Sequence, residues 1–137
     1  MSDNLKTAMA ISATGMRAQG FRLKIVAQNI ANVSTTADRT GGDPYRRKIV
    51  TFENVLNREL NAKTVGIQKV HKDPSDFRLK YDPNHPAADE QGMVQLPNVN
   101  ALVETIDMRE AQRSYEANLS MIEASKNLVS RTIGLLR

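Results

Sequence analysis

The chain has 137 residues, enough for one domain; 40% of them are apolar, but only 4% are aromatic and tryptophan is absent. Its formal net charge of +4 is spread thinly along the chain, and the single basic cluster is Arg46-Arg47-Lys48. Because nucleic-acid binders concentrate positive charge on one face, nucleic acid is not an expected partner, and this cluster is expected on a solvated strand edge. The absence of cysteine excludes disulfides and thiolate chemistry.

The N-terminal segment, Met1 to Ala10, lacks the charged region followed by an apolar region that marks a cleavable secretory signal. No apolar run approaches the roughly 18 residues of a transmembrane helix, so no such helix is expected. We therefore expect the protein either to stay in the cytosol or to leave the cell by a route that needs no cleaved signal.

Residues 1–33 are predicted to form a long N-terminal helix. Apolar and small side chains alternate at spacings of four and three residues, which is the pattern of a coiled-coil seam. The seam comprises Leu5, Met9, Ser12, Met16, Gln19, Leu23, Val26 and Ile30, and a second line beside it comprises Ala8, Ile11, Gly15, Ala18, Arg22 and Ile25. Such a helix either packs on the chain's own core or is marginal alone and is stabilised by several neighbours.

This helix is predicted to end within Asn29-Ile30-Ala31-Asn32 and the hydroxyl-rich Val33-Ser34-Thr35. Asparagine is favoured at helix ends because its amide competes for backbone hydrogen bonds. We expect Ile30 to anchor on the C-terminal helix while the two amides bond backbone groups at this exit, in the same chain or in a neighbouring one.

Residues 34–97 are predicted to form an extended middle segment with one small β-hairpin. The hairpin is expected because two short runs of alternating residues flank a turn rich in aspartate and proline. The expected elements are strands at Lys48–Phe52, Val65–Val70 and Phe77–Tyr81, the last two paired around the turn Asp73–Asp76, a short helix over Phe52–Ala62 and a loop over Tyr81–Pro97.

Residues 98–137 are predicted to form the second long helix. Asn98 or Asn100 can cap it, and Glu104 suits its early turns through the helix dipole. Its seam comprises Met108, Gln112, Tyr115, Leu119, Ile122, Lys126, Val129, Ile133 and Leu136, with Ala111, Met121, Leu128 and Leu135 beside it. The two terminal helices are therefore expected to pair as an α-helical hairpin or coiled coil, which gives a mainly α fold.

No group of residues predicts catalysis. His71 and His85 are the only histidines, and two isolated histidines without cysteine do not predict a metal site. Gly41-Gly42 is not a phosphate-binding loop, because no Gly-Lys-Ser/Thr follows it. No serine lies in the strand–turn–helix context of a nucleophile elbow. We therefore expect neither an enzyme nor a cofactor or metal.

Motifs at the two ends of the chain carry a family resemblance. Asn29-Ile30-Ala31-Asn32 is followed by Thr35, and the stretch Met108–Asn118 contains Ala-Gln-Arg-Ser-Tyr-Glu-Ala-Asn. Together these motifs resemble the signatures of the flagellar rod and hook family. Distal rod and hook members continue the first motif with Thr-Pro-Gly-Tyr, whereas here Thr36–Gly42 intervenes before Asp43-Pro44-Tyr45. With the short middle segment, this departure is similar to the proximal rod members.

The resemblance implies a structural subunit of the flagellar basal-body proximal rod that self-assembles through its terminal helices. It implies that residues 1–33 and 98–137 form an inner tube and that residues 34–97 pack outside it. It further implies export through the flagellum's own type III apparatus without a cleaved signal, into a rod that crosses the periplasm. The implied partners are other proximal rod proteins, the distal rod protein, and the base of the structure near the export gate.

The assembly interface is expected on the two terminal helices. A helix with apolar residues on more than one line can contact its own partner helix and a neighbour at once, as the heterologous contacts of a helical tube require. The expected interface residues are Leu23, Val26, Asn29, Ile30, Asn32, Met108, Gln112, Tyr115, Asn118, Leu119, Ile122, Val129 and Ile133.

The main alternative is a cytosolic helical-hairpin adaptor or chaperone-like binding module. It predicts a discrete oligomer in which both helices are ordered in solution. A basic nucleic-acid binder is the second alternative, and it predicts a salt-sensitive shift of duplex DNA. The even distribution of charge argues against that second alternative.

Overall fold

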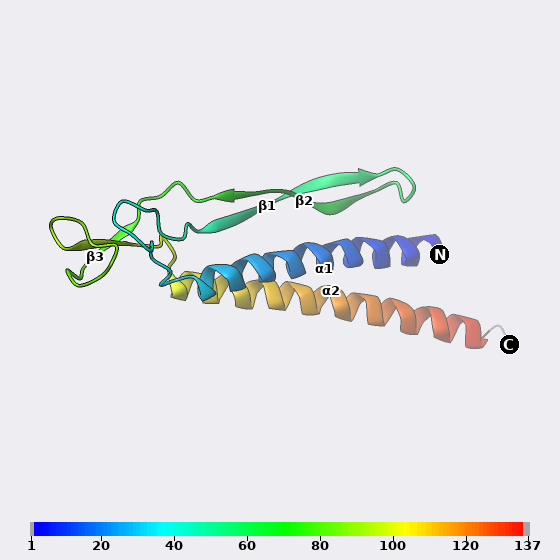
Figure 1. The fold of residues 1–137 in the computed structure, drawn as a ribbon. Coiled ribbons are helices and arrows are strands. Elements are labelled where there is room, and N and C mark those ends of the chain that lie inside the picture. The colour runs from blue at the N-terminus through cyan, green and yellow to red at the C-terminus, as the bar shows by residue number, and fades with distance from the viewer. Residues whose placement is uncertain (1, 136–137) are drawn as a thin grey trace. The chain divides into compact units, whose positions relative to one another are not determined.

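The computed structural model describes residues 2–135, with two long helices at the ends of the chain and two small two-stranded sheets between them (Figure 1). The elements are α1 (Ser2–Ala31), β1 (Lys48–Asn57), β2 (Ala62–Lys72), β3 (Arg78–Tyr81), β4 (Met93–Leu96) and α2 (Ala101–Leu135). The two helices pack against each other, so the predicted fold class is confirmed. Leu136, the last residue of the predicted seam, lies outside the described residues.

Two compact units make up the chain, and each helix runs through both of them. One unit consists of residues 24–50 and 70–108, and holds the end of α1, the β3–β4 sheet and the first turns of α2. The other unit consists of residues 1–23, 51–69 and 109–137, and holds most of α1, the body of the β1–β2 hairpin and the rest of α2.

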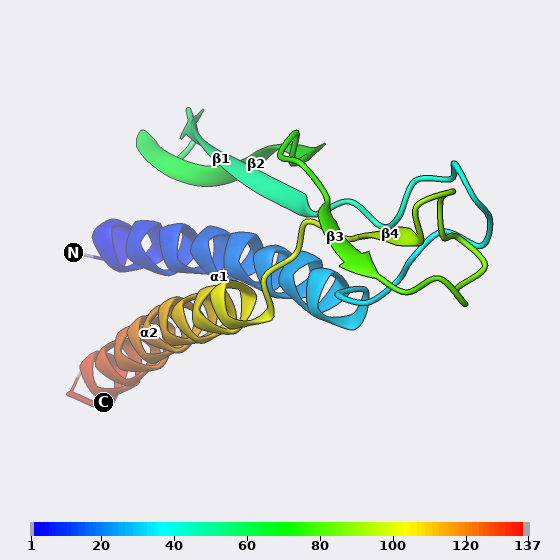
Figure 2. The same cartoon turned by 90° about the vertical axis from the view of Figure 1, so that its left-hand side faces the viewer.

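The β3–β4 sheet is antiparallel, with a register that runs from Arg78 opposite Leu96 to Tyr81 opposite Met93. Figure 2 shows it as a sheet distinct from the β1–β2 hairpin. Val94 in β4 is only 2% exposed. Gly92, just before β4, has a φ of 77°, and a Cβ there would lie 2.9 Å from Cε2 of the Tyr81 ring. This turn therefore requires glycine for its backbone conformation and for space.

Three predictions for the middle segment were wrong. Residues 52–62, predicted as a short helix, complete β1, pass through a turn in which Asn61 has a φ of 46°, and begin β2. The predicted hairpin joined Val65–Val70 to Phe77–Tyr81, but β1 pairs with β2 and β3 pairs with β4. The predicted loop Tyr81–Pro97 contains β4. Cross-strand partners stabilise a strand, and the weak helical spacing of a short segment does not reveal them.

The end of α1 lies inside the predicted exit stretch. The backbone N–H of Asn32 donates to the carbonyl oxygens of Gln28 at 3.1 Å and Asn29 at 3.2 Å, which closes the last turn. The Asn32 side chain adds a local cap, because its Nδ2 donates to the Gln28 carbonyl at 2.8 Å and its Oδ1 accepts from Thr35 Oγ1 at 3.1 Å. The predicted helix exit is thus confirmed.

Asn100 caps the start of α2. Its side-chain Oδ1 accepts hydrogen bonds from the backbone N–H groups of Leu102 at 3.0 Å and Val103 at 3.4 Å. These donors belong to the first turn, where the helix offers no carbonyl partner, so the cap satisfies them. Of the two asparagines that could cap the helix, Asn100 does so, and Asn98 bonds elsewhere.

Candidate assembly site

A buried cluster of polar side chains joins the end of α1 to the start of α2. All of its members belong to one compact unit, and they come from segments far apart in the sequence. We call this cluster the polar junction, and its members are Asn29, Tyr45, Arg47, Lys48, Asp73, Asn98 and Glu104.

Asn29 lies at the centre of the polar junction and is 1% exposed. Its Nδ2 donates to the carbonyl oxygen of Lys48 at 2.9 Å and to Glu104 Oε2 at 3.0 Å. Its Oδ1 accepts from the Tyr45 hydroxyl at 2.9 Å and from the Lys48 backbone N–H at 3.0 Å. Both amide protons and both acceptor positions are therefore used, so the buried amide is fully satisfied. One side chain thereby ties α1 to β1 and to α2.

Glu104 is a fully buried carboxylate in the first turn of α2, at 0% exposure. Its Oε2 accepts from Asn29 and its Oε1 accepts from Arg47 Nε, so each oxygen has a partner. Arg47 also lies 3.4 Å from a carboxylate oxygen of Asp73 and 3.7 Å from one of Asp107. A buried charge is tolerated only when it is paired and hydrogen-bonded. Arg47 supplies the counter-charge to carboxylates of two segments, the first turns of α2 and the turn after β2.

The junction shifts the ionisation of its members. Burial raises the pKa of Tyr45, and the negative charge of Glu104 raises it further, so the phenol stays protonated and donates to Asn29. Burial alone would lower the pKa of Arg47, but hydrogen bonds and charge from Glu104, followed by those from Asp73, raise it above its usual value. Hydrogen bonds from Ser75, with a smaller contribution from Arg47, lower the pKa of Asp73.

Asn98 extends the junction to the turn after β2. Its Oδ1 accepts from the Arg47 backbone N–H at 2.8 Å, and its Nδ2 donates to the carbonyl oxygens of Asp73 and Ser75, both at 3.1 Å. Arg46 donates to the same two carbonyl groups at 2.9 and 3.0 Å. The turn is therefore held from two sides by side chains that come from distant parts of the chain.

The basic cluster does not form the solvated strand edge that was predicted. The Arg46 guanidinium lies over the Phe77 ring, 4.1 Å from its centroid. The Arg47 side chain is 21% exposed and pairs with carboxylates, and Lys48 Nζ donates to Gln28 Oε1 at 3.2 Å. The prediction was wrong because neither the carboxylates nor the aromatic ring lies next to the cluster in the sequence.

The other compact unit joins α1 to α2 through small side chains. Gly15 faces Asn118, and a Cβ on Gly15 would lie 3.0 Å from both amide heteroatoms of that side chain. Gly20 lies next to the Tyr115 ring, and a Cβ on Gly20 would lie 3.8 Å from Cε2 of that ring. Arg22 pairs with Glu110 at 3.6 Å. The helices therefore run antiparallel and approach closely where α1 has glycine.

The buried line on α2 differs from the bulky apolar series read from the sequence. Ala111 and Ser125 are 0% and 4% exposed, and with Asn118 they repeat every seven residues. The larger side chains one position further on, such as Leu119 at 38%, remain exposed. Small residues allow the close approach of the two helices, so bulky residues cannot occupy the same line.

The predicted interface residues fall into three groups by exposure. Their part in assembly stays a prediction, since only contacts within one chain are present. Val26 and Asn29 are buried, Leu23, Ile30, Asn32, Met108, Tyr115, Asn118 and Ile122 are half-buried, and Gln112, Leu119, Val129 and Ile133 are exposed.

Most members of the polar junction were not expected from the sequence. Glu104 lies seven residues before Ala111, a member of the second line predicted on this helix, which was a usable signal for burial. Tyr45, Arg47 and Asn98 had no such signal, because their partners lie in other segments.

The described residues contain no candidate for a metal site or for a membrane-spanning helix. Among residues 2–135, no group of three or more acidic or histidine side chains is arranged to hold a metal ion. Neither described helix has the length and apolar character that crossing a membrane requires. The polar junction joins the end of α1 to the start of α2. Large apolar side chains remain exposed on α2.

Comparison with known proteins identifies the family. The family described as flagellar basal body rod FlgEFG protein C-terminal matches residues 90–135. The flagellar basal-body rod protein FlgC of Agrobacterium fabrum is 49% identical over 135 residues, covering 98% of this chain and 97% of that protein. FlgC of Bacillus subtilis is 36% identical over 141 residues, covering 92% and 94%, and FlgC of Borreliella burgdorferi is 35% identical over 150 residues, covering 97% and 98%.

These full-length similarities place the chain among the structural proteins of the flagellar axis, as its motifs implied. The chain belongs to the FlgC family of flagellar basal-body rod proteins. It is a structural subunit of that rod and not an enzyme. This membership sets aside the cytosolic adaptor or chaperone-like alternative.

Proposed function

We propose that the chain occupies the proximal part of the rod and assembles there through its terminal helices. In this proposal residues 1–33 and 98–137 of successive subunits form the inner tube, and residues 34–97 lie outside it. The predicted interface residues on the two helices make these contacts. The neighbours are other proximal rod proteins, the distal rod protein, and the base of the structure near the export gate.

One observation carries the proposal. In a member of a rod-protein family, α2 leaves Met121, Leu128 and Ile133 more than half exposed, at 54%, 53% and 57%. Exposed apolar side chains along a whole helix are costly in water, so they indicate a surface that another helix covers. Heterologous contacts between such helices generate an open helical tube.

The finer location follows from the same proposal. The rod spans the periplasm, and the chain reaches it through the flagellar type III export apparatus without a cleaved signal. The absence of cysteine suits passage as a reduced, unfolded chain followed by folding in an oxidising compartment.

The test is a deletion strain complemented with the chain carrying a small internal epitope. A suitable site is the turn between β1 and β2, where Arg58 and Glu59 are exposed. We expect the complemented cells to swim and immunogold label to mark the cytoplasm-proximal end of purified rods. Label at the distal end would contradict the proximal position, and swimming by the deletion strain without the chain would contradict the rod function.

A further inference from the structure

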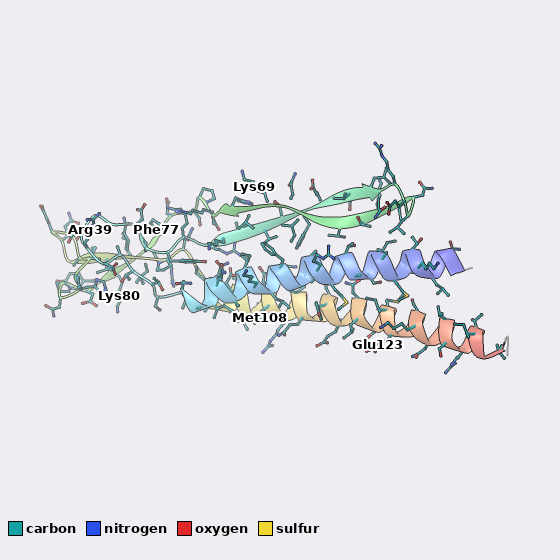
Figure 3. The ribbon with its side chains drawn as sticks, turned by 45° about the vertical axis from the view of Figure 1, so that its right-hand side comes forward. Arg39, Lys69, Phe77, Lys80, Met108 and Glu123 are labelled. Carbon is teal, nitrogen blue, oxygen red and sulfur yellow. The ribbon has the colours of Figure 1, made fainter. Side chains whose placement is uncertain are left out.

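Two loops of the compact unit that holds the polar junction are joined by side-chain hydrogen bonds outside that junction. One is the 36–42 loop, which follows the exit of α1. The other is the 82–92 loop, which connects β3 to β4. Figure 3 labels Arg39 in the first loop and Lys80 in β3, just before the second loop.

His85 lies where the two loops meet and is half-buried. The backbone N–H of Ala87 donates to Nδ1 of the His85 ring at 3.0 Å. A backbone N–H can only donate, so Nδ1 has no proton, and the neutral ring carries its proton on Nε2. Nε2 lies 3.2 Å from Thr36 Oγ1 and therefore donates to that hydroxyl. The neutral ring thus connects the two loops in one tautomer only.

The turn that His85 closes also holds the 36–42 loop through Thr40. Thr40 Oγ1 donates to the carbonyl oxygens of Pro86 at 3.3 Å and of Ala88 at 3.0 Å. The backbone N–H of His85 donates to the carbonyl oxygen of Asp82 at 3.2 Å, and the N–H of Ala88 donates to that of His85 at 2.9 Å. The two carbonyl groups that Thr40 contacts are therefore placed by the same turn.

A second proton on the ring removes one of these hydrogen bonds. Histidine is the side chain that changes its charge between about pH 8 and about pH 5. The protonated ring has an N–H at both nitrogens, so Nδ1 can no longer accept from Ala87, and two donors face each other. The hydrogen bond to Thr36 is unaffected, because Nε2 donates in both forms. The turn at Ala87 therefore loses the hydrogen bond that closes it.

The charged groups beside the ring do not replace that hydrogen bond. The titratable side chains that line the cavity next to His85 are Lys80 of β3 and Asp82, which directly follows β3. Lys80 Nζ lies 4.0 Å from a carboxylate oxygen of Asp82, so each charge offsets the other. The remaining lining residues come from the α1 exit and from β4 and carry no charge; they are Ser34, Thr36, Val94 and Leu96.

We propose that His85 makes the contact between the 36–42 loop and the 82–92 loop sensitive to acid. The neutral ring holds the two loops together, and protonation opens the turn at Ala87 and releases Thr40 from its two carbonyl partners. The inference does not depend on the proposed function, because it concerns two loops of one chain. A partner that contacts these loops would meet a different surface in acid.

NMR of the purified, ¹⁵N-labelled full chain tests the proposal at about pH 8 and at about pH 5.5, a range in which histidine titrates while aspartate and glutamate stay mostly ionised. At the higher pH the His85 ring should carry its proton on Nε2, and nuclear Overhauser contacts should connect Thr40 with residues 86–88. Once the ring has gained its second proton, we expect those contacts to be lost. A proton on Nδ1 at the higher pH, or unchanged contacts around a protonated ring, would overturn the proposal.

Two variants separate His85 from other groups that titrate. His85→Asn keeps an acceptor in place of Nδ1 but has no charge to gain, because an asparagine amide oxygen can accept from the same N–H. Its contacts between Thr40 and residues 86–88 should therefore persist at both pH values. His71→Asn, at the other histidine, is the matched control and should lose the contacts in acid as the unaltered chain does. Loss of the contacts in acid by His85→Asn, or their retention by His71→Asn, would assign the effect to another group.

Discussion

The two compact units hold α1 and α2 together by opposite means. In the unit around Asn29, a buried network of amide, phenol, guanidinium and carboxylate groups fixes the helix ends to the middle segment. In the unit around Gly15, glycines of α1 face the Asn118 amide and the Tyr115 ring of α2, and several large apolar side chains of α2 remain exposed. The first arrangement is complete within one chain, whereas the second leaves surface to bury on assembly.

The two units serve different purposes. The polar junction sets how the two helices of one chain pack, and we expect the exposed apolar side chains of α2 to contact neighbours during assembly. Buried polar groups tolerate only one geometry, because each unpaired group carries a penalty. The polar junction therefore fixes the register of the two helices. Small residues allow close packing but bury little apolar area, so we expect that unit to gain stability when neighbours in the rod cover it.

The largest effect is expected from breaking the polar junction. Arg47→Ala leaves the buried Glu104 carboxylate without its counter-charge, and removing one partner of a buried ion pair costs about 3–5 kcal/mol. Urea unfolding of the purified monomer measures this loss. Arg39→Ala, at an exposed arginine, is the matched control and should change the free energy of unfolding by less than about 0.5 kcal/mol. Equal effects of the two variants would contradict the role given to Arg47.

The next effect separates the two asparagines of the exit stretch. Asn29→Ala leaves Tyr45, Lys48 and Glu104 without a hydrogen-bond partner. Each buried group left unpaired costs about 1–3 kcal/mol. Asn32→Ala removes only a local cap, which costs roughly 1 kcal/mol. Unfolding of both variants and swimming of complemented cells give the comparison. If Asn32→Ala were the more damaging, the exit stretch would act through contacts between subunits and not through the polar junction.

Hydrogen exchange should show the same contrast along each helix. In the isolated monomer, amide hydrogens in residues 4–23 and 109–134 should exchange faster than those in residues 24–31 and 101–107. The first set belongs to the unit with small contacts and exposed apolar surface, and local opening costs less there. Mass spectrometry after proteolysis resolves these segments. Uniformly strong protection along both helices would contradict the expectation.

Stability should fall at both ends of the pH range through different residues. The pKa of Asp73 is lowered in the folded protein, so its contribution is present above the unfolded pKa of about 4 and is lost as pH falls through the folded value. The pKa of Tyr45 is raised, so its contribution is present below the unfolded pKa of about 10 and is lost as pH rises through the folded value.

Two variants separate these contributions in unfolding curves measured from acid to alkaline pH. Asp73→Asn should reduce the pH dependence of the free energy of unfolding on the acid side only. Tyr45→Phe should reduce it on the alkaline side only. A change on the wrong side for either variant would contradict the assignment.

The smallest effect on the monomer is expected at an exposed apolar residue of α2. Leu128→Gln should change the free energy of unfolding by less than about 0.5 kcal/mol, because the side chain is already 53% exposed. The same substitution should reduce swimming, since it weakens a contact repeated at every subunit. Ser130→Gln, at a nearby exposed position, is the control and should leave swimming unchanged. A large loss of monomer stability with Leu128→Gln would show that the chain itself covers this residue.

The sequence by itself determined the two helices, the exit of the first, the asparagine cap of the second, and the family. Each of these depends on local signals: a four-three spacing, residues that favour helix ends, and two motifs of the axial proteins. Local signals also placed strands near Val65–Val70 and Phe77–Tyr81.

Only the tertiary structure decided which strands pair, which line of α2 faces α1, and what Arg47 and Glu104 do. Strand pairing is set by partners distant in the chain, so the hairpin predicted around Asp73–Asp76 was wrong. The large apolar residues of α2 looked like the intramolecular seam, but close approach at Gly15 selects small residues for that line. A buried carboxylate next to a helix start is acceptable only because an arginine many residues away reaches it, and no local pattern contains that information.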